Sequence, residues 1–118
     1  MGLTTIKAKV LNPAEISRFA ELEFLVDSGA MYSVVPRSVL ENLGIKPNTT
    51  KRFYMVDGTG ITTEIGNAFF EYGDQVTTAP VVFGEEGDAA LMGATTLEGF
   101  GLMLDPLRRE LRPMFMRL

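Results

Sequence analysis

The chain has 118 residues, of which 46% are hydrophobic and 22% charged, a composition typical of one globular domain and not of a disordered chain. Its formal net charge is −4, with 11 Lys and Arg against 15 Asp and Glu, and this acidic balance argues against a nucleic-acid-binding protein. The chain has no Cys and no His, which excludes disulfides, thiolate catalysis, Ser-His and Cys-His mechanisms and the usual His-based metal sites.

The first quarter of the chain is predicted to form strands. In residues 5–10 apolar and Lys residues alternate, as in a half-buried strand. Residues 12–17 contain Asn-Pro and are predicted to be a turn or a short excursion. Residues 21–26 alternate again, and the alternation fades at Val26, as expected for a strand that enters the core.

The next residues, Asp27-Ser28-Gly29-Ala30, put one carboxyl group into an apolar run. Gly29 and Ala30 allow a tight turn, which would present Asp27 at the end of a rigid strand, near the core and beside backbone N–H groups. An alternative is an Asx-type turn in which Asp27 only caps its own loop. A phosphorylatable degron is disfavoured, because degrons need exposed and flexible chain.

One short helix is clear from the sequence, over residues 36–44. Pro36 lies at the first turn, where its missing N–H does no harm. Val39, Leu40 and Leu43 fall on one face, and Gly44 can take the left-handed position after the last turn.

The remaining chain is predicted to consist of short strands joined by glycine-containing turns. A hairpin tip is expected at 57–60 and an acidic surface loop at 84–88, where a solvated loop is favoured over a cation site. One or two helical turns are expected at 95–101. Strands are expected at residues 50–56, 61–72, 76–83, 90–93, 102–105 and 111–118. Together these elements predict one mainly β domain, closed or sandwiched, over residues 1–118.

The order of motifs resembles that of the retropepsin-like aspartic proteases. The stretch Val26-Asp27-Ser28-Gly29-Ala30 is followed by the helix, by the glycine-containing hairpin, and then by Leu91-Met92-Gly93 before a short helix. The resemblance implies a closed β-barrel-like fold in which Asp27, Ser28 and Gly29 form the catalytic loop and each subunit carries half of the site. It also implies hydrolysis of peptide bonds, with a peptide or protein as substrate.

Because Asp-Ser-Gly occurs only once, the resemblance implies a homodimer in which each subunit contributes one Asp27. Two carboxylates ~3 Å apart would repel by roughly 5 kcal/mol at an effective dielectric constant near 20, so such a pair shares one proton and activates one water between them. Ser28 would hydrogen-bond across the dimer. Met103, Met114 and Met116 lie in the terminal strands, where the family forms its dimer sheet, and Ala94 stands where viral members usually have an Arg that braces the dimer.

Substrate contacts are implied for three further regions. The tip Asp57-Gly58-Thr59-Gly60 is identified as the flap that covers an extended peptide. Tyr54 either lines the cleft or packs beneath it. Contacts are also expected from Ala30 and from Leu91, Met92 and Gly93, which would lie beside the catalytic loop.

Two other functions are compatible with these residues. The chain could be a non-catalytic dimeric module that binds extended peptides, or a purely structural β-domain. Neither cofactor nor metal is expected in any case. No apolar run approaches the ~20 residues that span a membrane, and the N-terminus lacks a signal-peptide pattern. The absence of Cys also fits a reducing compartment, so a cytoplasmic protein without membrane partners is expected.

Overall fold

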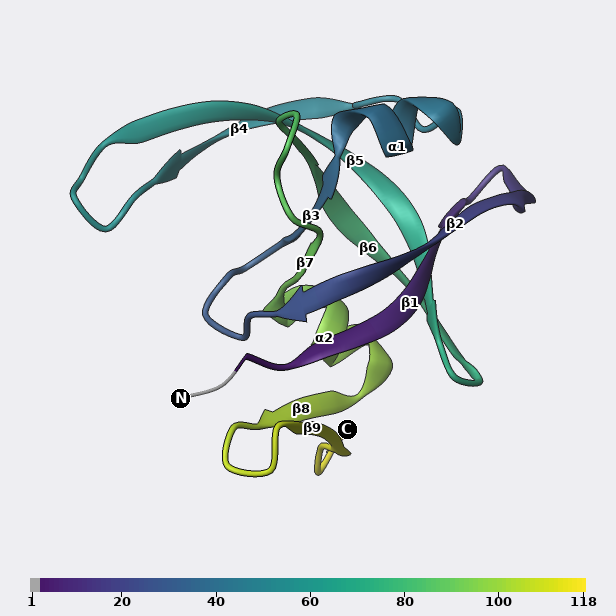
Figure 1. The fold of residues 1–118 in the computed structure, drawn as a ribbon, viewed down its shortest axis with the longest axis vertical. Helices are drawn as coiled ribbons and strands as arrows, with labels where there is room; N and C mark the ends of the chain where they lie inside the picture. The colour runs from purple at the N-terminus through teal and green to yellow at the C-terminus, as the bar shows by residue number, and fades with distance from the viewer. Residues whose placement is uncertain (1–2) are drawn as a thin grey trace.

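The computed structural model describes residues 3–118, which form a mainly β structure with two short helices (Figure 1). The helices are α1 (Arg37–Asn42) and α2 (Ala94–Phe100). The strands are β1 (Thr5–Asn12), β2 (Glu15–Val26), β3 (Ser33–Pro36), β4 (Thr49–Tyr54), β5 (Gly60–Tyr72), β6 (Gln75–Gly84), β7 (Leu91–Met92), β8 (Leu102–Asp105) and β9 (Glu110–Pro113). No helix in this range has the length and apolar character needed to cross a bilayer.

Seven of the strands form one sheet in the order β1-β2-β7-β3-β6-β5-β4. An additional pairing of β1 with β5 closes this sheet into a ring and leaves β4 outside it. The mainly β, closed fold expected from the sequence is therefore confirmed. The short strand β7 lies between β2 and β3, parallel to the first and antiparallel to the second, so it brings residues 91–93 beside the loop that follows β2.

The core fills the inside of the ring. Its largest fully buried side chains include Phe24 of β2, Phe70 of β5 and Phe83 of β6. Phe24 and Phe70 meet edge to face with ring centroids 6.1 Å apart, which ties β2 to the strand that closes the ring. A rigid, well-packed body thus supports the loops at its rim.

The first hairpin differs from the prediction of a turn over residues 12–17. The turn is shorter, and β2 begins at Glu15, opposite Asn12. The register shifts between Leu11 and Asn12, as in a β-bulge. The side chains of residues 15–19 are exposed, so this end of β2 lacks the apolar alternation that marks a half-buried strand, and its pairing with β1 defines it instead.

Both helices lie where the sequence predicts helical residues. Helix α1 follows Pro36, and Gly44 has φ +80°, the left-handed conformation expected after the last turn. The one or two helical turns expected at 95–101 form helix α2 over residues 94–100. Leu97 and Phe100 lie three residues apart and bury one face of α2 against the core, which stabilises so short a helix.

The C-terminal strand is shorter than the predicted 111–118. Strands β8 and β9 form a separate two-stranded sheet in which Leu102 pairs with Pro113 and Asp105 with Glu110. The N–H of Met114 still donates to the carbonyl of Gly101 at 2.8 Å, but β8 begins only at Leu102, and residues 114–118 continue without regular structure. Met114 and Met116, expected in a terminal strand, therefore lie beyond β9.

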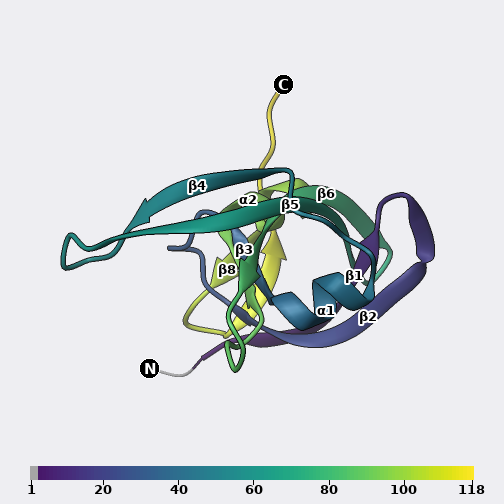
Figure 2. The same cartoon turned by 90° about the horizontal axis from the view of Figure 1, so that it is seen from above.

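Figure 1 shows that the β4–β5 hairpin projects beyond the ring, on the same side as the loop between β2 and β3, and that β8 and β9 lie at the opposite end. The view from above shows the same projection of the hairpin (Figure 2).

Candidate active site

Hydrogen bonds fix the loop that carries Asp27 to the segment that carries Gly93. The N–H of Asp27 donates to the carbonyl of Met92 at 2.9 Å. From the other side, the N–H groups of Ala94 and Thr95 donate to the carbonyls of Ala30 and Met31, at 2.7 and 3.0 Å. The two motifs singled out in the sequence thus meet in space, joined through main-chain atoms.

Asp27 itself stands at the end of β2 in a tight turn. The N–H of Gly29 donates to Asp27 Oδ1 at 3.0 Å, and the N–H of Ala30 donates to the Asp27 carbonyl at 3.2 Å. The expected position beside backbone N–H groups is found, and so is the Asx-type turn. The side chain is exposed in the single chain, although its neighbours Phe24 and Val26 are buried. A carboxylate in water costs no desolvation, which explains how an apolar run can end in an acid.

Gly93 is required by a close approach of the main chain. A Cβ atom at this position would lie 2.6 Å from the carbonyl carbon and oxygen of Tyr32 and 2.9 Å from the carbonyl oxygen of Ala30. Any side chain would push the loop that carries Asp27 away from β7. The glycine of Leu91-Met92-Gly93 therefore sets the distance between the two segments.

A buried pair of hydroxyls braces the same junction and was missed in the sequence. Ser33 Oγ and Thr96 Oγ1 lie 2.6 Å apart, and both residues are fully buried. Ser33 Oγ also accepts the N–H of Gly93 at 3.0 Å. Ser33 could have been noticed as a polar residue in the apolar run before Val34, but its partner is 63 positions away and carries no local signal.

A groove of about 670 Å³ opens beside this loop. One wall is the loop itself, from Gly29 to Tyr32, a second is the β4–β5 hairpin, and a third is the end of β6 with the acidic loop that follows. Tyr32 and Phe53 meet edge to face across it with centroids 5.9 Å apart. The lining residues are Gly29, Ala30, Met31, Tyr32, Val34, Phe53, Tyr54, Met55, Ile61, Thr62, Thr63, Val82, Phe83, Gly84, Glu85, Asp88 and Leu91.

The hairpin has two different faces, because side chains alternate along a strand. Phe53 pairs with Ile61 and contacts Tyr32, so this cross-strand pair faces the groove. Arg52 pairs with Thr62, donates to its Oγ1 at 3.3 Å and lies over the Tyr54 ring at 5.8 Å. The Tyr54 ring therefore packs with Arg52, and it is 70% exposed.

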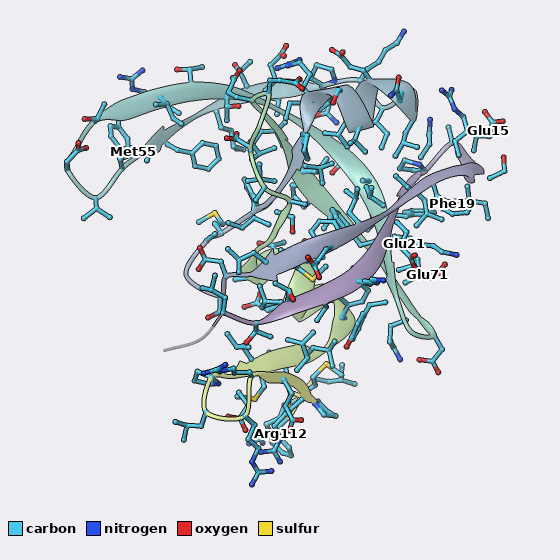
Figure 3. The ribbon with its side chains drawn as sticks, in the orientation of Figure 1. Glu15, Phe19, Glu21, Met55, Glu71 and Arg112 are labelled. Atoms are coloured by element: carbon cyan, nitrogen blue, oxygen red, sulfur yellow. The ribbon has the colours of Figure 1, made fainter. Side chains whose placement is uncertain are left out.

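The tip of the hairpin is ordered by its own hydrogen bonds. The N–H of Thr59 donates to Asp57 Oδ1 at 2.9 Å, the N–H of Met55 donates to the Thr59 carbonyl at 2.8 Å, and Gly58 takes φ +88°. The N–H of Thr59, together with its hydroxyl, lowers the pKa of Asp57 below the usual range of a carboxyl group. Figure 3 labels Met55 near the end of this projecting hairpin.

The structure distributes the remaining predicted residues over several places. Asp57, Gly58, Thr59 and Gly60 belong to the tip and do not line the groove of the single chain. Met92 is 0% exposed and belongs to the core, next to Leu91, which does line the groove.

Ser28 lies away from the groove, in a second recess of about 290 Å³ formed with α2, β8 and Met114. Within residues 3–118, no group of three His, Cys, Asp or Glu side chains is arranged to hold a metal ion.

Comparison with known proteins places this geometry in a family. A family model described as aspartyl protease matches residues 13–96. No curated protein matches significantly.

Three solved structures have the same fold. A retropepsin-like aspartic protease from Rickettsia conorii is 21% identical with a TM-score of 0.61, and the match covers 88% of this chain and 77% of that one. EIAV protease in complex with the inhibitor HBY-793 is 16% identical with a TM-score of 0.61, covering 88% and 93%. The retroviral protease-like domain of Ddi1 from Leishmania major is 15% identical with a TM-score of 0.60, covering 96% and 89%. The resemblance inferred from the sequence is thereby confirmed.

The hydroxyl pair gives a first prediction. Replacing Ser33 by Ala leaves the Thr96 hydroxyl and the Gly93 N–H without their buried partner, so we expect the free energy of unfolding to fall by about 1–3 kcal/mol in urea denaturation. The exposed Ser38→Ala on α1 serves as the matched control, with an expected change within about 0.5 kcal/mol. Equal effects of the two substitutions would show that the pair does not brace the junction.

The tip of the hairpin gives a second prediction. Since the folded pKa of Asp57 is lowered, its hydrogen bond to Thr59 is fully present above the unfolded pKa of about 4 and is lost only as the pH falls through the lower folded value. Carboxyl-carbon NMR titration should find Asp57 ionising below the usual range, and Thr59→Ala should raise its pKa in part. Thr50→Ala, on exposed β4, should leave it unchanged; an ordinary pKa for Asp57 in the wild type contradicts the assignment.

Proposed function

The chain belongs to the aspartyl protease family, and from this membership we propose that it is an aspartic-type endopeptidase that works as a homodimer. Residues 1–118 would act as one protease domain, with half of the active site in each copy. The observation that carries the proposal is the single Asp27, exposed at the end of a buried strand in a loop held by main-chain hydrogen bonds to residues 92–95.

The exposure of Asp27 supports assembly from two copies. A family mechanism with two carboxyl groups needs a second acid, and the chain has one Asp-Ser-Gly loop. An exposed Asp27 can be approached by the same loop of a second copy across a two-fold axis. The partner would then remove solvent from both acids, which strengthens their interaction with each other and with the reacting groups.

The surface next to Ser28 supports the same assembly. Its recess is lined by Leu97 and Leu104 and by Met103, which is 50% exposed. The end of the chain adds further exposed apolar side chains, Leu107, Phe115, Met116 and Leu118. So much apolar surface in one region is typical of a protein–protein contact. We therefore assign the dimer contact to this recess and to residues 103–118.

The proposed reaction uses the two Asp27 side chains in opposite protonation states. The ionised carboxylate takes a proton from the trapped water as the water oxygen attacks the carbonyl carbon of the peptide. The protonated carboxyl group, Asp27 of the partner subunit, donates its proton to the carbonyl oxygen. The carboxyl group that took the water proton then gives it to the amide nitrogen as the C–N bond breaks, and the partner's Asp27 carboxylate takes a proton from a hydroxyl of the gem-diol, so that one carboxyl is again protonated. Ser28 would hold the two loops in register by a hydrogen bond across the dimer.

The groove and the hairpin above it provide the proposed substrate contacts. An extended peptide placed between the catalytic loop and β4–β5 would contact Ala30 and Leu91 and the apolar inner face of the hairpin. Tip residues 57–60 would close over the peptide as a flap and exclude water. Since the chain has no cysteine to oxidise, we place this activity in the cytoplasm.

The second candidate is a dimeric module that binds extended peptides without cutting them. The observation that favours it is the composition of the groove, whose lining residues do not include Asp27. Because the groove does not depend on Asp27 for its lining, it could bind a peptide even if the two acids do not cut it.

The proposal predicts that Asp27→Asn reduces peptide cleavage by roughly a hundred-fold or more, because it removes the acid–base group while keeping the size of the side chain. The matched control is Asp74→Asn, an exposed Asp in the β5–β6 turn, which should leave the rate unchanged. Binding without cleavage in the wild type would favour the second candidate.

Mixing the two proteins tests the dimer. Equal amounts of wild type and Asp27→Asn are mixed and allowed to exchange subunits. The mixture should have about one quarter of the activity of the same total amount of wild type alone, because only that fraction of dimers has two acids. Retention of one half would mean that each chain acts alone and would refute a shared site.

A further inference from the structure

The groove that we propose as the peptide site is apolar in its walls but acidic at one end. Glu85 and Asp88 are its only charged lining residues within the part of the chain that the structure describes. Both come from the loop that follows β6, which the sequence predicts to be a solvated surface loop. Both are exposed, and among residues 3–118 neither makes a salt bridge.

The position of these two acids is fixed. Asp88 Oδ2 accepts the N–H of Glu85 at 2.8 Å, and the Asp88 N–H donates to the Glu85 carbonyl at 3.1 Å. The loop is therefore closed on itself. Gly84, at the end of β6 where this loop begins, lies close to Val34. A Cβ atom on the glycine would come within 2.9 Å of the Val34 side chain. The acids are thus tied to the apolar wall formed by Val34.

The nearest cation does not neutralise this end of the groove. Arg37 lies over the Phe83 ring at 5.1 Å. The pKa of Arg37 is raised mainly by its hydrogen bond to Glu64, and the negative charge of Glu85 also contributes. The Arg37 guanidinium, however, is engaged by Glu64 at 2.6 Å and by Glu41 at 3.7 Å. The other cation near the groove, Arg52, is not among the lining residues, and its guanidinium is engaged by the Thr62 hydroxyl and the Tyr54 ring. The charge that faces a bound peptide at this end is negative.

We infer that the groove selects peptides in which a Lys or Arg side chain lies next to a large apolar side chain. The apolar side chain would fill the space between Tyr32, Phe53 and Ile61, and the basic side chain would reach Glu85 and Asp88. Both basic side chains have apolar stems, which suit the apolar wall, and charged ends that suit the acids. The inference rests on the proposed peptide-binding function of the groove. In a homodimer the same preference would occur at two symmetry-related positions of the peptide.

The experiment measures binding apart from cleavage. Asp27→Asn protein, which should bind peptides without cutting them, is titrated with fluorescent extended peptides that differ only in Lys, Met or Glu at one position, scanned along an otherwise apolar sequence. At one position we expect Lys to bind about fivefold or more tightly than Met, and Glu more weakly than Met, with the difference decreasing at high salt.

Two sets of substitutions in the Asp27→Asn background locate the effect. Glu85→Gln with Asp88→Asn should remove the preference for Lys while leaving the affinity for the Met peptide unchanged, since the amide oxygen introduced by Asp88→Asn can still accept the main-chain N–H of residue 85. The matched control is Glu86→Gln, an exposed acid in the same loop that does not line the groove, and it should keep the preference. Glu85→Lys should reverse it toward Glu.

The outcomes separate the inference from the function that it rests on. Binding with no preference for Lys at any position, or loss of the preference in Glu86→Gln alone, overturns the inference and leaves the peptidase proposal intact. A clear preference for Lys in a protein whose wild type cuts no peptide supports the inference and overturns the peptidase proposal. Failure of every peptide to bind overturns both.

Discussion

The structure depends on one close contact, the main-chain junction between the loop after β2 and the segment 92–95. Asp27 donates to Met92, Ala94 donates to Ala30, and no Cβ atom fits at Gly93. These hydrogen bonds join two segments more than sixty residues apart in sequence, and they do so at the point where β7 enters the sheet between β2 and β3. The loop that carries Asp27 is therefore positioned by the closed sheet and not by its own turn alone, and the two-fold site that we propose would need such a fixed loop.

The same junction divides the surface into two regions with different partners. On one side of the loop lies the apolar groove with its acidic end, which we assign to a peptide. On the other side lies the recess at Ser28, with exposed apolar side chains from residues 103–118, which we assign to the second subunit. Asp27 stands between them and is exposed in the single chain. This arrangement is compatible with the proposed dimer, in which each copy contributes its own groove and one of two acids.

Short sequence patterns predicted the elements whose structure depends on neighbouring residues in the chain. Gly44 and the apolar face of residues 39–43 predicted α1, and the glycines at 58 and 60 predicted the hairpin tip. Long-range features had no such signal. The hydroxyl pair of Ser33 and Thr96 depends on how two distant segments pack, the exposed end of β2 is defined by its pairing with β1, and β9 stops where β8 provides no further partner. The exposure of Asp27 could not be foreseen either, since its neighbours in sequence are apolar while its side chain faces solvent. Only the likeness of two separated motifs to a known family connected Asp27 with Gly93 before the fold was seen.

A crystal structure of the assembled protein would show whether two copies of this chain share one pair of acids. The quantity to measure is the distance between the carboxyl oxygens of the two Asp27 side chains. We expect a two-fold dimer in which these oxygens lie within hydrogen-bond reach of each other, about 3 Å, or of one shared water. A monomer at high concentration, or a dimer in which the two Asp27 side chains face away from each other, would contradict it.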